Sequence, residues 1–284
     1  MKYVYPLISF LLLSVVYTAN AQDDILLPEN FYVHKGEKIN VHLVNVNQFS
    51  KQDELSFDPA KIQKFTLGWG KKARDLMPEL KATDTATSIK FDKDGLNTLT
   101  MTMKPVLDDI ERDDFIKILE DEGLTDFAEK AKNGSKDSFR ERYTWYLKSL
   151  IKVQDKTTAN DFEKSQGQDF EITLKDNPYK GSYGDDIIAS VMFRDKPAVN
   201  ATVLFYIKAA DGNVFVQKLN ADKQGFVYFK LTREGIYLLR SAHMEVSKDK
   251  SADYEAWLAT YTFAFESTNE MPNTYKQFGF GNKH

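Results

Sequence analysis

The sequence predicts a mainly β protein: two β-sandwich domains with a three-helix segment between them. Short apolar runs separated by turn residues dominate both ends of the chain, and the apolar period becomes helical only between about 108 and 153. Hydrophobic residues make up 42% of the 284 residues, so the chain can bury a substantial core. This length suits one large domain or two of ordinary size.

The first sandwich is expected over residues 22–107. Residues 38–44 alternate between apolar and polar side chains, which is the pattern of a strand with one buried face. His42 falls on the polar face and is therefore expected to be exposed. Further strands are expected near 65–67, 89–91 and 99–103.

The helical segment, residues 108–153, begins with two short helices. The first carries an apolar stripe on one face and ends at Gly123, a residue suited to a helix C-terminus. The second runs from Thr125 to Lys132. The stripe of the first helix consists of Phe115, Ile118 and Leu119.

A third helix is predicted from Ser138, because Ser138 followed by Glu141 has the pattern of a capping box. Its apolar stripe consists of Phe139, Tyr143, Tyr146, Leu147 and Leu150. A stripe of this kind must be buried, and the preceding sheet is the nearest partner.

The chain becomes polar again at residues 154–168, which are interpreted as a linker. The second sandwich is expected over 169–267, where seven short strands alternate with turns. The segment 268–284 has no period and is predicted to be an irregular tail. The seven strands are 170–174, 187–193, 202–209, 214–219, 226–231, 236–245 and 257–266.

The first 21 residues have the features of a secretory signal peptide. Lys2 precedes an apolar run, and Ala19-Asn20-Ala21 is a small-residue site that predicts cleavage before Gln22. We therefore expect a periplasmic or secreted protein. The chain has no cysteine, which excludes disulfides, thiolate metal sites and thiol catalysis.

Charge and motifs exclude several function classes. The formal net charge of −4 gives no general attraction to nucleic acid or anionic lipid. No segment of the mature chain is long and apolar enough to span a bilayer. Nucleophile elbows, zinc helices, P-loops and dinucleotide fingerprints are all missing from the sequence, so we expect a non-catalytic protein.

His243 is the best single candidate for a metal contact. It lies at the end of a predicted strand, and neutral imidazole suits nickel, copper and zinc. A hydrogen-bonded structural histidine is the alternative reading of the same residue.

Short blocks spread along nearly the whole mature chain have a recognisable order and spacing. The blocks are Leu26-Leu27-Pro28, Phe57-Asp58-Pro59-Ala60, Glu122-Gly123-Leu124, Arg140-Glu141-Arg142-Tyr143, Asn177-Pro178-Tyr179 and Ala242-His243-Met244. Together they resemble one large bacterial family, a secreted family of unknown function that is related to the NikM component of nickel and cobalt uptake.

The resemblance implies β-sandwich parts, no enzyme activity and a role in handling nickel or cobalt beside an envelope transporter or another periplasmic protein. Many members begin the mature chain with a histidine, but Gln22 occupies that position here. Only Asp23 and His243 carry over as metal ligands.

Two other functions stay open. Residues 196–203 and 235–237 resemble carboxypeptidase-regulatory or transthyretin-like sandwiches, which predicts a structural or interaction module that binds an envelope protein or a polysaccharide. The second is an enzyme such as a glycosidase, which no sequence motif supports. It would require a cleft with two carboxylates about 5–10 Å apart.

Overall fold

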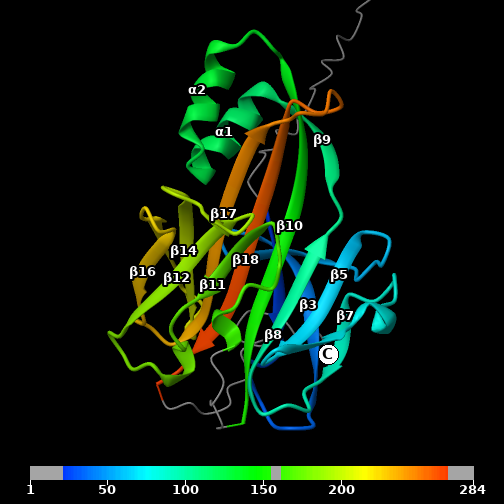
Figure 1. Cartoon of the computed structure of the whole chain (residues 1–284), viewed down its shortest axis with the longest axis vertical. Coiled ribbons are helices and arrows are strands. Elements are labelled where there is room, and N and C mark those ends of the chain that lie inside the picture. Colours follow the sequence, from blue (N-terminus) through cyan, green and yellow to red (C-terminus); the bar gives the residue numbers. More distant parts are fainter. Residues whose placement is uncertain (1–21, 155–160, 268–284) are drawn as a thin grey trace, which may run out of the picture.

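The computed structural model of the chain describes residues 22–154 and 161–267 (Figure 1). The predicted signal peptide, the first part of the predicted linker and the predicted tail lie outside these residues. Among the described residues, none of the helices has the length and apolar character that crossing a bilayer requires. The mainly β class is confirmed.

One large sheet organises the molecule. Its ten strands include eight in the order β15-β14-β17-β18-β10-β8-β5-β6, while β2 and β9 also pair with β10. The strands of this sheet are β2 (Tyr32–Val33), β5 (Ile62–Trp69), β6 (Lys72–Asp75), β8 (Gly95–Met103), β9 (Val106–Glu111), β10 (Ser138–Val153), β14 (Thr202–Ala209), β15 (Val214–Asn220), β17 (Gly235–Val246) and β18 (Tyr254–Phe265).

Two smaller four-stranded sheets complete the β structure. The first pairs β1-β3-β4 with β7 beside β3, and the second pairs β11-β12-β13 with β16 beside β12. Their strands are β1 (Asp23–Pro28), β3 (Lys38–Asn47), β4 (Ser50–Leu55), β7 (Ala86–Lys90), β11 (Phe170–Leu174), β12 (Asp186–Phe193), β13 (Lys196–Pro197) and β16 (Phe226–Lys230). Short 3-10 turns occupy Met77–Glu79, Asp161–Glu163 and Pro178–Lys180.

The predicted third helix is wrong, because residues 138–153 form the long strand β10. β10 runs parallel to β18 and antiparallel to β8, so it joins strands from the two halves of the sequence. Ten consecutive residues from Thr144 are buried, since both faces of the strand are covered. A strand buried on both faces has apolar residues in succession, and that run also satisfies a helical stripe.

The two small sheets cover opposite faces of the large one. Trp145 and Leu147 of β10 pack in one cluster with Leu43 of β3. Tyr146 and Leu150 lie on the other face, in a cluster with Ile172 of β11. The large sheet takes strands from both predicted sandwiches, and the division into two domains stays a prediction.

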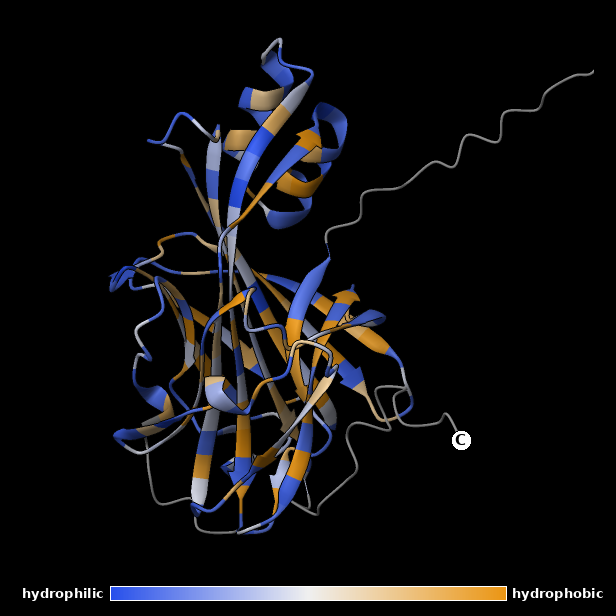
Figure 2. Ribbon diagram, turned by 90° about the vertical axis from the view of Figure 1, so that its right-hand side faces the viewer, coloured by the Kyte–Doolittle hydropathy of each residue, from blue (hydrophilic) through white to orange (hydrophobic). Residues whose placement is uncertain are grey.

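The first two predicted helices are confirmed as α1 (Arg112–Glu122) and α2 (Thr125–Asn133). They lie at one end of the molecule, beside the ends of β10, β17 and β18, with polar outer faces (Figures 1 and 2). Gly123 ends α1 in a left-handed conformation with φ of 75°. A Cβ atom there would lie 2.3 Å from Thr202 Oγ1, so the glycine also permits a close approach.

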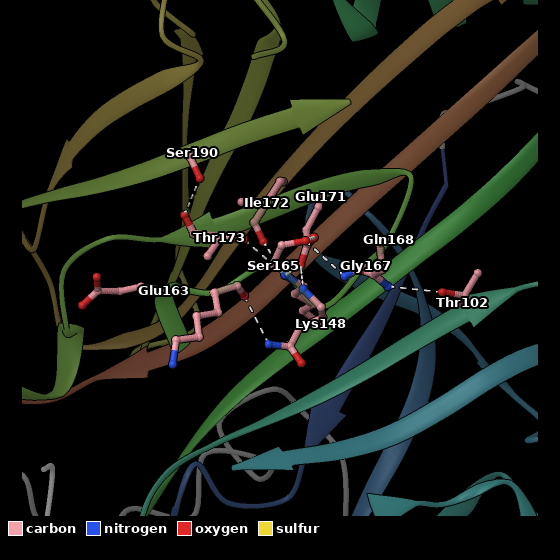
Figure 3. A network of polar contacts seen from close by, with 12 residues as sticks. Thr102, Lys148, Glu163, Ser165, Gly167, Gln168, Glu171, Ile172, Thr173 and Ser190 are labelled. Atoms are coloured by element: carbon pink, nitrogen blue, oxygen red, sulfur yellow. Dashed lines mark hydrogen bonds and ion pairs between the residues drawn. The ribbon is translucent and has the colours of Figure 1, made fainter. Parts of the chain in front are cut away.

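The described part of the predicted linker packs onto the sheet. Phe162 is 5% exposed and belongs to the core. Ser165 Oγ and the Gln166 amide N–H both donate to the Glu171 carboxylate, each at 2.6 Å. Lys148 of β10 donates to the same carboxylate from below (Figure 3). The segment therefore closes a buried polar network between β10 and β11.

Candidate ligand-binding cavity

Arg240 is a buried cation at the centre of the molecule. It lies on β17 and is 2% exposed. Its Nε donates to Asp23 Oδ1 at 2.6 Å, and its terminal NH2 group donates to Glu122. Asp23 begins β1 and Glu122 ends α1, so one guanidinium holds three elements together.

The charge of Arg240 is secured by these two carboxylates. Burial works to lower the pKa of Arg240, but Asp23 and Glu122 outweigh that effect and place the pKa above its usual range. A buried charge that is paired in this way is tolerated, whereas an unpaired one is costly. The cluster is therefore a fixed part of the fold.

A cavity of about 360 Å³ opens beside Arg240. We call it the acidic cavity, because four carboxyl groups and one guanidinium line it together with two aromatic rings. Its walls come from β1, β3, β4, β9, α1, β10, β17 and β18. The lining residues are Gln22, Asp24, Asn45, Leu55, Asp108, Ile110, Ile118, Glu122, Glu141, Tyr143, Trp145, Arg240 and Leu258.

Glu141 is the unusual member of this lining. Its side chain belongs to a residue that is only 7% exposed, and within the described chain it makes neither a hydrogen bond nor an ion pair. Burial raises the pKa of Glu141 to about 8, and the negative charges of Glu122 and Asp108 add to the rise, while Arg240 opposes it. An unpaired buried carboxyl group is a costly feature, and such groups gather at functional sites.

Two neighbours share this electrostatic environment. Burial raises the pKa of Asp24 to about 6, although a hydrogen bond from Asn45 at 2.9 Å opposes the rise. Burial also raises the pKa of Tyr143 to about 12, helped by the charges of Asp108, Asp24 and Glu141. The cavity therefore contains carboxyl groups with raised pKa values. A bound positive charge would lower these pKa values and stabilise the groups as carboxylates.

The sequence-predicted candidate His243 lies elsewhere. Its ring stacks against Phe193, with ring centroids 4.0 Å apart, and lies 5.8 Å from the ring of Trp257. Burial lowers its pKa, while Glu245, whose carboxylate lies 3.8 Å from Nε2, opposes the shift. His243 is thus a neutral ring in an aromatic cluster at neutral pH.

The structure does not bring Asp23 and His243 together. Asp23 is paired with Arg240, and Arg240 and His243 lie three residues apart on a regular strand, which places them on opposite faces. Within 22–154 and 161–267, no group of three or more His, Cys, Asp or Glu side chains has the arrangement of a metal site. Metal binding by either residue stays a prediction.

Comparison with known families identifies one match. The profile of a family described as a domain of unknown function, DUF4198, matches residues 19–245. The chain belongs to this family. The match confirms the resemblance to a family of unknown function, and the link of the DUF4198 chain to the NikM component stays a prediction. No curated protein sequence matches it.

Solved structures resemble this DUF4198 chain only distantly. A tetra-tandem repeat from the extending region of a large adhesion protein is 10% identical, with a TM-score of 0.23 over 86% of this chain, which spans 50% of that fragment. The D0-D1 domain of intimin is 13% identical, with a TM-score of 0.21 over 87% of this chain and 100% of that one. Three N-terminal domains of the bacteriophage RB49 outer capsid protein Hoc are 9% identical, with a TM-score of 0.21 over 86% and 71%.

Sequence reasoning missed the residues of the acidic cavity. Glu141 was assigned to a helix cap, which left no reason to consider it buried. Arg240 carried a usable signal, because it follows the apolar run Ile236–Leu239 directly and a charged residue inside a buried strand requires a partner. His42, which the sequence predicts to be exposed, is 7% exposed, and its Nε2 lies 3.3 Å from Glu29.

Proposed function

We propose that this chain is an exported, non-catalytic binding protein that holds a small cation in the acidic cavity. The observation that carries the proposal is Glu141, a nine-tenths buried carboxyl group that lines the cavity and has no partner among the described residues. A cation bound in the cavity would pair with the carboxylate of Glu141 and so offset the cost of burying it.

The charge balance of the lining supports a cation over an anion. Asp24, Asp108, Glu122 and Glu141 face a single guanidinium, and that guanidinium is already engaged by Glu122 and by Asp23. An anion would meet uncompensated carboxyl groups, whereas a cation lowers their mutual repulsion.

The resemblance to the NikM-related family adds a separate proposal, a role beside a transition-metal transporter that handles nickel or cobalt. The predicted export signal agrees with a protein of the periplasm or of the cell exterior. Support for nickel or cobalt comes from the resemblance alone, because no histidine lines the acidic cavity.

Isothermal titration of the untagged chain from Gln22 to His284 tests the proposal. The titrants are nickel, cobalt, n-butylammonium and tetramethylammonium. We expect saturable binding of at least one cation, weakened tenfold or more by Glu141→Gln. The matched control is Glu129→Gln, which removes an exposed carboxylate on α2 and should leave binding unchanged. Absence of binding by every cation would refute the proposal.

An interaction module is the second candidate, and one surface favours it. β15 is an edge strand of the large sheet, and Val216 on it is 63% exposed. Tyr228 on β16, a strand of the second small sheet, is 54% exposed and lines the same surface hollow as Val216, so large side chains are exposed beside the edge strand β15. A photo-crosslinking residue at Val216 should capture an envelope protein that the same residue at Lys64 does not.

A further inference from the structure

We infer that the cation held by the acidic cavity is an organic ammonium group, bound between the ring of Tyr143 and the unpartnered carboxylate of Glu141. The inference rests on the proposed function, because it names the class of cation that the same cavity binds.

The first reason is the pattern of side chains on β10. Glu141, Tyr143 and Trp145 alternate along the strand, so they point to one face of the sheet, and all three line the cavity. One wall therefore presents two aromatic rings and a carboxyl group in a row. Carboxylates supply charge and hydrogen-bond acceptors, while aromatic rings attract the C–H and N–H groups of an ammonium ion.

The second reason is the position of Tyr143. Its ring lines the same cavity as Asp24, Asp108 and Glu141, and the negative charges of these three groups help to raise the pKa of its phenol group. The Tyr143 hydroxyl makes no hydrogen bond within the described chain and is free to contact a ligand. The face of an aromatic ring attracts an ammonium ion, so a ring that shares the cavity with carboxyl groups offers the ligand both kinds of contact.

The third reason is that the ligand set does not suit a metal. No histidine lines the cavity, and the carboxylate of Glu122 is engaged by Arg240. The described residues hold no cluster of three or more metal-ligating side chains at suitable spacing. A metal ion requires four or more ligands at about 2.0–2.6 Å, whereas an ammonium group is satisfied by about three acceptors at hydrogen-bond distance.

The size of the cavity agrees with an organic ligand. Ligand pockets in proteins fall in the range of about 300–1,000 Å³, and the volume of about 360 Å³ lies at its lower end. The cavity therefore suits a small amine rather than a polymer segment.

Binding should release a proton. The protonated carboxyl group of Glu141 and a ligand ammonium ion give a carboxylate–ammonium pair and one free proton. Charged and titratable groups face Glu141 from its own strand and from four other elements: Tyr143 of β10, Asp24 of β1, Asp108 of β9, Glu122 of α1 and Arg240 of β17. In the chain that begins at Gln22, the α-amino group of this residue is a further titratable group at the cavity. The positive charge of the ligand offsets the negative charge of the neighbouring carboxylates. The carboxylate form of Glu141 is therefore the stable form when the ligand is bound.

The pH dependence follows from that exchange. Burial places the pKa of Glu141 at about 8 in the empty cavity. The affinity should therefore rise about tenfold per pH unit between pH 6 and pH 8 and then level off, because below pH 8 the ligand must displace a proton. An alkylamine stays protonated over this range.

The test compares n-butylammonium with n-pentanol, a neutral ligand that is one methylene group longer, by isothermal titration of the chain from Gln22 to His284 at pH 6, 7, 8 and 9. Nickel and cobalt are titrated in parallel. We expect n-butylammonium to bind at least tenfold more tightly than n-pentanol at pH 8, with the predicted rise from pH 6. Binding should also weaken at least tenfold in Glu141→Gln.

Tyrosine variants separate the ring from the hydroxyl group. Tyr143→Phe keeps the ring and should bind within threefold of the wild type, whereas Tyr143→Leu should bind at least tenfold more weakly. The comparison of ligands on the wild-type protein keeps the test informative even where a variant folds poorly.

The outcomes distinguish the inference from the proposed function. Nickel or cobalt binding that depends on Glu141, without n-butylammonium binding, would overturn the ammonium inference and leave the proposed function standing. Equal affinities for n-butylammonium and n-pentanol would also overturn the inference. Absence of binding by every cation would overturn both.

Discussion

Arg240 and His243 lie three residues apart on β17 and face opposite sides of the ten-stranded sheet. Arg240 meets the carboxylates of Asp23 and Glu122 on one side, and His243 stacks on Phe193 on the other. The sheet therefore separates the acidic cavity from the aromatic cluster that contains the histidine.

His243→Ala should accordingly leave cation binding in the acidic cavity unchanged within twofold. The variant should lose about 1–2 kcal/mol of stability, because the imidazole packs against Phe193 and its removal opens space in the cluster. Isothermal titration measures the affinity, and urea unfolding measures the stability. Loss of metal binding in this variant would instead place a metal site on the aromatic side.

Lys148 and Glu171 offer a second prediction, because both side chains are 3% exposed and form an ion pair. Burial works to raise the pKa of Glu171, but Lys148, Ser165 and the Gln166 amide outweigh it and hold the pKa below its usual range. Lys148→Met leaves this carboxylate buried without its cation and should cost about 3–5 kcal/mol.

A surface ion pair provides the matched control for Lys148→Met. Lys132 and Glu120 are each about half exposed, at 49% and 48% of the side chain. Lys132→Met should cost less than about 1 kcal/mol. Urea unfolding of the two variants checks the difference, and equal losses would mean that the buried network does not stabilise the junction of β10 and β11.

Glu141 should make the protein less stable as pH rises. Its pKa is about 8 in the folded chain and near 4.5 when unfolded, so between these values the folded state binds more protons than the unfolded state. The free energy of unfolding should then fall with pH, by up to about 1.4 kcal/mol per pH unit. Urea unfolding at pH 5, 6.5 and 8 should show a shallower fall for Glu141→Gln, and parallel curves would contradict the buried, unpaired carboxyl group.

Much of the fold follows from local sequence patterns. Turn residues and short apolar runs located seven of the eight strands that the structure describes in the C-terminal half, all but the two-residue β13, and Gly123 marked the end of α1. These features are local, because a turn or a helix C-terminus depends on the conformation of a few neighbouring residues.

The central strand and the cavity depend on long-range pairing instead. β10 is a strand because β8, β9 and β18 pair with it, and those partners lie up to 113 positions away in the sequence. Its apolar run fits a helix equally well when the partners are unknown. Glu141 becomes a site residue only when β1, β9 and α1 are placed around it, so no local pattern could have identified it.

The amino group of Gln22 should compete with a ligand in the chain that begins at this residue. Gln22 lines the acidic cavity, and Asp23 beside it is fixed by Arg240, so the new α-ammonium group would lie near Asp24 and Glu141. An α-amino group has a pKa of about 7.7–8.0 and is mostly charged at pH 7. Acetylation of the amino group removes that charge and should strengthen n-butylammonium binding about two- to fivefold.

The comparison uses acetylated and free forms of the same chain, titrated at pH 7 in the same buffer. An exposed lysine in the turn between β5 and β6, Lys71, serves as the control through Lys71→Gln. This turn lies at the Ile151 end of β10, ten residues along the strand from Glu141, so the change removes one positive charge far from the cavity. Because screening at physiological ionic strength limits charge effects to about 8 Å, the control should change affinity little. Equal effects of the two changes would show that the amino group acts only through net charge and does not occupy the cavity.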